Sequence, residues 1–233
     1  METPSSPKLS LGQIAQLIDH SLLQPQLDQA ELEAGIAEAL QYSMAAASVK
    51  PCDVAFTARA LQGKSVLTGT VIGFPHGANI TRVKVYEAIE AIEDGAQELD
   101  MVMNIGHFKS GHYDAIEGDI RAVVEAAHER SVGVKVIFEI HYLTTEEIVQ
   151  ACELSETAGA DFVKTSTGYA PSGATLEAVR LMRKSCGPQT KIKAAGGIRT
   201  LDQLLAYHEA GADRIATRAS VAILEEAISR GFN

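Results

Sequence analysis

The sequence has few cysteines, and those that it has are scattered. Cys52, Cys152 and Cys186 are the three cysteines of this 233-residue chain, and long stretches separate them. An odd and scattered set supplies neither a disulfide framework nor the ligand spacing of a zinc site. We therefore expect a protein of a reducing compartment, which is the cytoplasm.

The sequence also lacks an excess of positive charge. Lysine and arginine number 20 against 30 aspartates and glutamates, which gives a formal net charge of -10. Such an acidic chain is a poor partner for nucleic acid or for an anionic membrane, so we expect neither. It can still bind a small anion locally, through backbone amides and a few arginines.

Signals for membrane insertion and export are missing as well. No apolar run is long enough to span a bilayer. The first seven residues have neither the basic start nor the apolar core of a signal peptide. We expect residues 1–8 to form a disordered lead-in and residues 9–233 to form a single domain.

Two further absences narrow the chemistry. The glycine fingerprint of dinucleotide-binding folds does not occur. His107 and His112 do not have the spacing of a zinc-binding helix, and no aspartate-rich or glutamate-rich metal cluster is present. These absences disfavour metal-dependent catalysis, and we expect no metal and no organic cofactor.

Short apolar strands alternate along the chain with segments of helical periodicity. Such strands, rich in β-branched or small residues and bounded by turn signals, are typical of a parallel sheet buried on both faces. We expect seven of them, at residues 45–49, 66–72, 98–103, 134–140, 162–164, 192–195 and 214–216. Residues 18–22 are the candidate for an eighth strand, after a helix over residues 11–17.

Helix start and stop signals repeat between these strands. Thr144 and Thr200 each open a helix as N-caps, and Gly159 and Gly211 close those helices. The triplets at 94–96, 158–160 and 210–212 share a central glycine followed by alanine, each just before a strand. Repeated strand–helix units of this kind predict a single (β/α)8 TIM barrel with a short N-terminal helix. An open doubly wound sheet is the alternative fold.

Two lysines lie near the carboxyl ends of buried strands, and each is followed by small residues and glycine. They are Lys164 and Lys193. Burial lowers the pKa of a lysine, and a second ammonium group nearby lowers it further. The free amine can then attack a carbonyl carbon and form a Schiff base. A single such lysine would more often extend its ammonium group to solvent, as we expect for Lys191 at the opposite rim.

Other polar residues also follow the strands, at the end of a barrel where active sites lie. They are Ser48, Lys50, His76, Asp100, Asn104, Glu139, His141, residues 165–167, Thr217 and Arg218. Asp100 interrupts an apolar strand in which Glu98, Asp100 and Val102 point to one side. Its carboxylate is either a structural partner of a lysine or a proton-transfer group, and the sequence leaves both roles open.

Two segments after the last strands suggest a phosphate site. Gly196 and Gly197 let the backbone approach a ligand and expose amides to an anion, although a glycine pair also suits an ordinary turn. Thr217 and Arg218 follow the final strand, and Arg218 is either a phosphate ligand or a surface residue paired with a carboxylate. The loops after strands seven and eight are the usual phosphate site of barrels.

Five segments resemble signatures of the 2-deoxyribose-5-phosphate aldolase family, and the likeness extends from about residue 11 to residue 224. Residues 163–168 (Val-Lys-Thr-Ser-Thr-Gly) are similar to its Schiff-base segment, and residues 193–200 (Lys-Ala-Ala-Gly-Gly-Ile-Arg-Thr) to its second-lysine segment. Residues 98–106 resemble its aspartate strand, and residues 18–23 and 71–77 resemble two more of its signatures.

The resemblance implies a class I aldolase. It would cleave 2-deoxy-D-ribose 5-phosphate reversibly to D-glyceraldehyde 3-phosphate and acetaldehyde in deoxyribose phosphate catabolism. Lys164 would form the imine, Lys193 would lower the pKa of Lys164, and Asp100 would transfer protons. The implied substrate-binding and phosphate-binding residues are Asp19, Thr167, Gly168, Gly196, Gly197, Arg199, Thr217 and Arg218. A homo-oligomer, either a dimer or a tetramer, is also implied.

The chain departs from the family pattern at four places. Ser48 and Lys50 stand where many relatives carry cysteine and asparagine, and Gln24 stands where a lysine is frequent. Residues 216–218 (Ala-Thr-Arg) replace a glycine-threonine-serine turn, and residues 229–233 lack the C-terminal tyrosine that some members use. Two other functions stay open. One is a Schiff-base aldolase for a different sugar or keto phosphate, and the other is a barrel that binds sugar phosphate without turnover.

Overall fold

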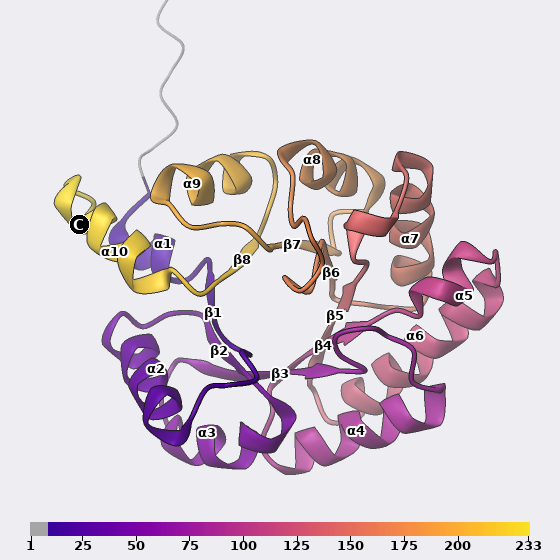
Figure 1. Cartoon of the computed structure of the whole chain (residues 1–233), viewed down its shortest axis with the longest axis horizontal. Coiled ribbons are helices and arrows are strands. Elements are labelled where there is room, and N and C mark those ends of the chain that lie inside the picture. The colour runs from indigo at the N-terminus through magenta and orange to yellow at the C-terminus, as the bar shows by residue number, and fades with distance from the viewer. Residues whose placement is uncertain (1–8) are drawn as a thin grey trace, which may run out of the picture.

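The chain folds into a closed barrel of eight parallel strands in sequence order, with helices around it (Figure 1). The structure is a computed structural model, and it describes residues 9–233. Each strand pairs with the next along the chain, and the pairing of the eighth strand with the first closes the barrel. The predicted (β/α)8 barrel is therefore confirmed, whereas the predicted lead-in at residues 1–8 lies outside the described residues.

All eight predicted strands are present, and their ends differ by a few residues. The strands are β1 (Ile18–Leu22), β2 (Ala46–Val49), β3 (Leu67–Ile72), β4 (Glu98–Val102), β5 (Gly133–Ile137), β6 (Phe162–Lys164), β7 (Lys191–Ala195) and β8 (Arg214–Thr217). The helices are α1 (Leu11–Ala15), α2 (Gln29–Gln41), α3 (Val54–Ala60), α4 (Thr81–Glu93), α5 (Ile105–Lys109), α6 (Tyr113–His128), α7 (Thr145–Thr157), α8 (Leu176–Ser185), α9 (Leu201–Glu209) and α10 (Ser220–Ser229).

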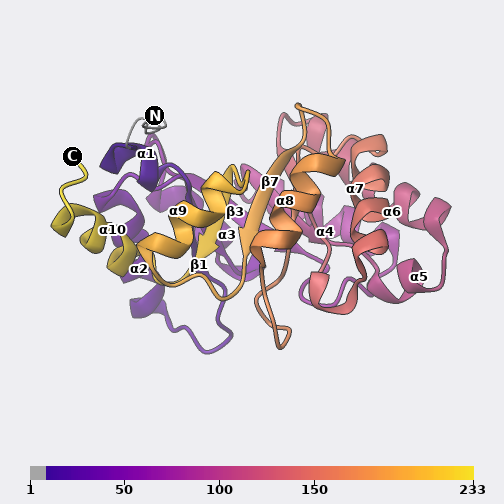
Figure 2. The same cartoon turned by 90° about the horizontal axis from the view of Figure 1, so that it is seen from above.

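The short N-terminal helix α1 lies beside the C-terminal helix α10 (Figures 1 and 2). A capping box at Ser10 begins α1, which ends at Ala15 and not at the predicted residue 17. The backbone N–H of Leu11 donates to the carbonyl of Asn233 over 3.2 Å. The two ends of the described chain therefore meet on one side of the barrel.

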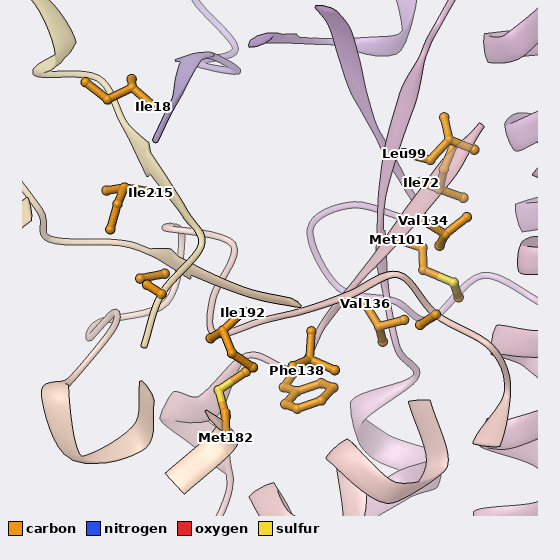
Figure 3. Close-up of a cluster of buried hydrophobic side chains, with 14 of the residues drawn as sticks. Ile18, Ile72, Leu99, Met101, Val134, Val136, Phe138, Met182, Ile192 and Ile215 are labelled. Carbon is orange, nitrogen blue, oxygen red and sulfur yellow. The ribbon is translucent and has the colours of Figure 1, made fainter. Parts of the chain in front are cut away.

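The main apolar core lies between the strands and the surrounding helices. Leu99 and Met101 of β4 belong to a large cluster of buried apolar side chains, in which Figure 3 shows Met182 of α8 beside Ile192 of β7. Side chains alternate along a strand, so Glu98 and Asp100 point to the barrel interior instead. The apolar residues of the cluster thus attach the helices to the strands, and the interior holds charged groups together with buried apolar residues such as Val102.

The predicted caps and the repeated turn are confirmed. Thr144 and Thr200 each form a capping box with the third residue of the helix. Gly95, Gly159 and Gly211 have φ values of 104°, 87° and 108°, and the residue after each donates its N–H back into the helix. In α7 the C-cap is Ala158, and Gly159 follows it. Only glycine adopts this left-handed conformation without steric cost.

Two further turns of this kind carry a serine at the glycine position, Ser43 after α2 and Ser131 after α6. Ser131 has a φ of 59°, and the next residue, Val132, donates its N–H to the carbonyl of Ala127. We expect Ser131→Gly to raise the free energy of unfolding by about 0.5–1 kcal/mol, since relief of strain exceeds the added chain entropy of glycine. Denaturant unfolding measures the change. Ser131→Ala keeps the strain, so a gain of the same size in that variant would contradict the explanation.

Candidate active site

Lys164, Lys193 and Asp100 meet inside the barrel, although they come from three different strands. One carboxylate oxygen of Asp100, Oδ2, accepts hydrogen bonds from Lys164 Nζ at 2.6 Å and from Lys193 Nζ at 2.7 Å. The exposed fractions of the three residues are 2%, 0% and 3%. Two lysines and one carboxylate thus share a site that water hardly reaches.

Burial and neighbouring charges set the protonation of this site. Burial lowers the pKa of Lys164 to about 8, the Asp100 carboxylate opposes that shift, and the Lys193 ammonium adds to it. Burial alone would raise the pKa of Asp100, but Lys164 and Lys193 hold it well below its ordinary value. Near neutral pH, Asp100 is therefore a carboxylate and a fraction of Lys164 is a free amine.

A cavity of about 660 Å³ opens at the carboxyl ends of the strands, and Lys164 lies in its wall. Its wall includes most of the residues expected to bind substrate, which are Thr167, Gly168, Gly196, Gly197, Arg199, Thr217 and Arg218. Among residues 9–233, the cations that line the cavity are Lys164, Arg199 and Arg218, and none of the carboxylates of this range lines it. In a chain with a net charge of -10, this local excess of positive charge favours an anionic ligand.

Asp19 is the expected substrate-binding residue that does not line the cavity. It is fully buried and forms ion pairs with Lys193 and Arg214. Burial alone would raise the pKa of Asp19, but Lys193, Lys135 and Arg214 lower it below its ordinary value. Its observed contacts therefore lie inside the barrel, and direct contact with substrate stays a prediction.

Glycine allows two loops of the cavity wall to touch. The N–H of Ala174 donates to the carbonyls of Ala195 and Gly196, at 3.0 and 3.1 Å. A Cβ atom on Gly173 would lie 2.3 Å from the Gly196 carbonyl oxygen, so a side chain there would push the loops apart. Thr217 Oγ1 donates to the carbonyl of Ile198 over 2.7 Å and joins the loops after β7 and β8. These contacts hold the wall around the predicted phosphate position.

Glu139 ends β5 earlier than the sequence predicted. It adopts a left-handed conformation, with φ 55° and ψ 64°, and so turns the chain after Ile137. Its buried carboxylate accepts hydrogen bonds from the hydroxyl and the N–H of Thr167. The N–H of Tyr169 donates to Thr167 Oγ1, and the hydroxyl of Tyr169 reaches across to the Leu23 carbonyl at 2.7 Å. No motif in the sequence pointed to Tyr169.

Two charged residues of the site were also missed, the buried Lys135 and the half-buried Arg214. Lys135 of β5 lies 2.7 Å from Glu98 and 3.2 Å from Asp100. Arg214 of β8 contacts Asp19 and Glu98. Both are cations inside apolar strands, which is the same signal that drew attention to Asp100.

The other polar residues that were noted lie further out or serve the loops. Gln24 and Ser48 line the cavity, whereas Lys50 donates to the Leu27 carbonyl and lies 3.4 Å from Asp53. Asn104 caps α5, and His141 bonds to Ser172. His76 and Lys191 are exposed, the latter as predicted.

Residues 9–233 lack a metal-binding cluster and a membrane-spanning helix. No group of three or more histidine, cysteine or acidic residues there could hold a metal ion. No helix in that part of the chain is long and apolar enough to cross a membrane. Cys52, Cys152 and Cys186 are free thiols. The expected independence from metal and cofactor stays a prediction.

Comparisons with known proteins agree on the family. The model of the DeoC/LacD family aldolases matches residues 13–226. The deoxyribose-phosphate aldolase of Thermococcus gammatolerans is 53% identical over 216 residues, which cover 92% of this chain and 96% of that one. A relative of the same name from Streptococcus equi subsp. zooepidemicus is 49% identical over 218 residues, which cover 94% and 98%.

A solved structure resembles the whole barrel. The deoxyribose phosphate aldolase from Aeropyrum pernix, described as tetrameric, superposes with a TM-score of 0.88 at 31% identity, covering 95% of this chain and 93% of that one. The sequence relatives and this structure match nearly the full length of the barrel that holds Lys164. The chain therefore belongs to the DeoC/LacD aldolase family.

Proposed function

We propose that this aldolase reversibly cleaves 2-deoxy-D-ribose 5-phosphate to D-glyceraldehyde 3-phosphate and acetaldehyde, by way of an imine on Lys164. The main support is the position of Lys164, a buried amine with a pKa of about 8 in the wall of a cavity lined by cations. An amine of this pKa supplies free nucleophile near neutral pH. The reaction belongs to deoxyribose phosphate catabolism, and we expect it in the cytoplasm.

In the proposed reaction, Lys164 Nζ attacks the aldehyde carbon C1 of the open-chain sugar, and loss of water gives a protonated imine. The imine accepts the electron pair of the C2–C3 bond while the C3 hydroxyl loses its proton. C3 leaves as the aldehyde carbon of D-glyceraldehyde 3-phosphate, and an enamine stays on the enzyme. Protonation at C2 and hydrolysis then release acetaldehyde and restore the amine.

Asp100 and Lys193 support this sequence of steps in different ways. Asp100 lies 2.6 Å from Lys164, so it is placed to transfer protons to and from groups at the imine. Lys193 is a cation on the same carboxylate oxygen, and it favours the neutral form of Lys164. We expect kcat/KM to rise with pH up to about 8, because Lys164 must lose its proton before it attacks.

The direct test is an assay of cleavage together with mapping of the intermediate. Incubation with 2-deoxyribose 5-phosphate should release D-glyceraldehyde 3-phosphate, and borohydride reduction should leave an adduct on Lys164 in a peptide map. An adduct formed only with another sugar or keto phosphate would favour the second aldolase function. Binding without cleavage or adduct would favour a non-catalytic binding protein and refute the proposal.

The proposed phosphate site includes Arg218, which lines a cavity whose wall contains no carboxylate of the described residues. A hydrogen bond to a charged group contributes about 1.5–3 kcal/mol. We therefore expect Arg218→Ala to raise the KM for 2-deoxyribose 5-phosphate about tenfold or more. Activity on unphosphorylated 2-deoxyribose should stay nearly unchanged, because that sugar has no group for Arg218 to bind.

The matched control is Arg180→Ala, which removes an exposed arginine of α8 outside the cavity. It should leave the KM values of both sugars unchanged. If Arg218→Ala reduced activity equally on both sugars, its role would be to support the loop and not to bind phosphate.

We also propose that the chain forms a homo-oligomer, either a dimer or a tetramer. Support comes from the A. pernix relative, described as tetrameric, and from large apolar side chains exposed on one face of the α4 region. These are Ile80, Val83 and Tyr86, with exposed fractions of 51%, 42% and 64%. Sedimentation equilibrium gives the assembly size, and a monomer at micromolar concentration would contradict this proposal.

A further inference from the structure

Six charged side chains inside the barrel form a closed ring in which acids and bases alternate. In order, its members are Asp100, Lys193, Asp19, Arg214, Glu98 and Lys135, which returns to Asp100. We call this set the charge ring. Its contacts include 2.7 Å between Lys193 and Asp100, 3.0 Å between Arg214 and Glu98, and 2.7 Å between Lys135 and Glu98. Every member therefore has two partners of opposite charge.

Five strands supply the charge ring, and it extends along the barrel axis. Glu98 and Arg214 are the first residues of β4 and β8, at the amino ends of the strands. Asp100 and Lys193 lie further along β4 and β7, at the level of Lys164. The ring therefore extends from the layer that contains Lys164 to the end of the barrel where the strands begin.

Lys164 is attached to the charge ring but is not a member of it. Its Nζ contacts Asp100 Oδ2, which the ring already shares with Lys193. Three carboxylates and three cations make the ring neutral when all six are ionised, so a protonated Lys164 adds one unbalanced positive charge. An unbalanced charge in a dry interior is unfavourable. Release of the proton from Lys164 makes the whole cluster neutral.

We propose that the charge ring sets the protonation state of Lys164, and that Glu98 and Lys135 are positioning residues for imine formation although neither lines the cavity. The inference rests on the proposed function, because it takes Lys164 as the nucleophile. Glu98 and Lys135 act through Asp100, whose second oxygen, Oδ1, lies 3.2 Å from Lys135. They keep that carboxylate ionised, in place and shared among three cations.

Other charges around Lys164 are consistent with this role. The Lys135 ammonium contributes to lowering the pKa of Lys164, after burial and Lys193. Besides Lys164 and the members of the ring, ionisable groups at the cavity are Arg199, Arg218 and Tyr169 in its wall, Glu139 behind Thr167 and His141 beside Ser172. None of these five belongs to the ring, so substitutions within the ring leave them in place.

The test removes one charge of each sign from the far side of the ring. Lys135→Met removes a cation, so Lys164 should hold its proton more strongly and imine formation should require a higher pH. Glu98→Gln removes an anion and should shift imine formation to lower pH. Each midpoint should move by about one to two pH units, as expected for one unit charge within roughly 10 Å at an effective dielectric constant near 20. The double variant is neutral again and should return towards the wild-type midpoint.

The measurement is the extent of the Lys164 adduct after treatment with acetaldehyde and cyanoborohydride at a series of pH values. The control is Asp119→Asn, which breaks the buried pair of Lys84 and Asp119 between α4 and α6, 2.6 Å apart. This substitution should lower the melting temperature without moving the midpoint. A structural loss alone would thus be distinguished from an electrostatic effect.

Midpoints that stay fixed, or that move in the same direction in both folded variants, would overturn the inference. If Lys135→Met does not fold, Glu98→Gln alone decides, and an unchanged or raised midpoint would overturn it. The absence of a Lys164 adduct in the wild-type protein would refute the proposed function instead. The two failures are therefore distinguishable.

Discussion

Lys164→Met is expected to abolish cleavage of 2-deoxyribose 5-phosphate, with a loss of roughly 10⁴-fold or more. The substitution keeps the length and apolar character of the side chain but removes the amine that forms the imine. The buried position leaves little room for water to replace that nucleophile. Initial rates, together with peptide mapping after borohydride reduction, measure the loss of both turnover and adduct.

The matched control for Lys164→Met is Lys191→Met. Lys191 is an exposed lysine at the start of β7, and its ammonium lies 5.4 Å from the centre of the Phe162 ring. Both activity and adduct should persist in this variant. Appearance of the adduct on Lys193 in Lys164→Met, with turnover retained, would reverse the roles of the two lysines.

Asp100→Asn is expected to separate turnover from imine formation. Turnover should fall by ~10²–10⁴-fold, because the variant lacks the carboxylate that transfers protons. The same carboxylate raises the pKa of Lys164, so its removal should lower that pKa further. Trapping of the imine with acetaldehyde should therefore persist near pH 7 while cleavage is slow, and single-turnover and steady-state rates together measure the difference.

Lys193→Met should shift the pKa of Lys164 in the opposite direction from Asp100→Asn. Loss of this ammonium should raise the pKa of Lys164, so trapping near pH 7 should decrease and recover at higher pH. If Asp100→Asn retained near-native turnover, Asp100 would be a structural partner of the lysines and not a proton-transfer group. That result would decide between the two roles that the sequence leaves open.

The fold could be predicted from the sequence because its signals are local. Capping boxes at Thr144 and Thr200, and a left-handed glycine before several strands, mark the repeated units without any knowledge of tertiary structure. The predicted end of β5 was wrong. Glu139 turns the chain there in a left-handed conformation, and a glutamate in the sequence gives no indication of such a turn. The predicted lead-in at residues 1–8 stays a prediction.

The sequence predicted only those residues of the candidate site that can be recognised within a single segment. Lys164 and Asp100 each stand out within their own strand, but their ion pair depends on how β4 and β6 are placed on either side of β5. Lys135 is adjacent to Asp100 only through the register of β4 and β5. For Asp19, the sequence suggested a substrate contact, whereas its partners come from β7 and β8. Such long-range pairing is fixed by barrel closure and not by local composition.

The closed charge ring also limits how this sequence can diverge. Losing one member leaves the ring with one uncompensated charge and each of two neighbours with one partner fewer. Breaking a buried ion pair costs about 3–5 kcal/mol. That is a large part of the roughly 5–15 kcal/mol by which a folded domain is stable. We therefore expect evolution to replace ring members two at a time, as a pair of opposite charge such as Glu98 and Lys135, so that the ring stays neutral. The barrel interior is inherited as a unit, while the outer faces of the helices are free to change one residue at a time.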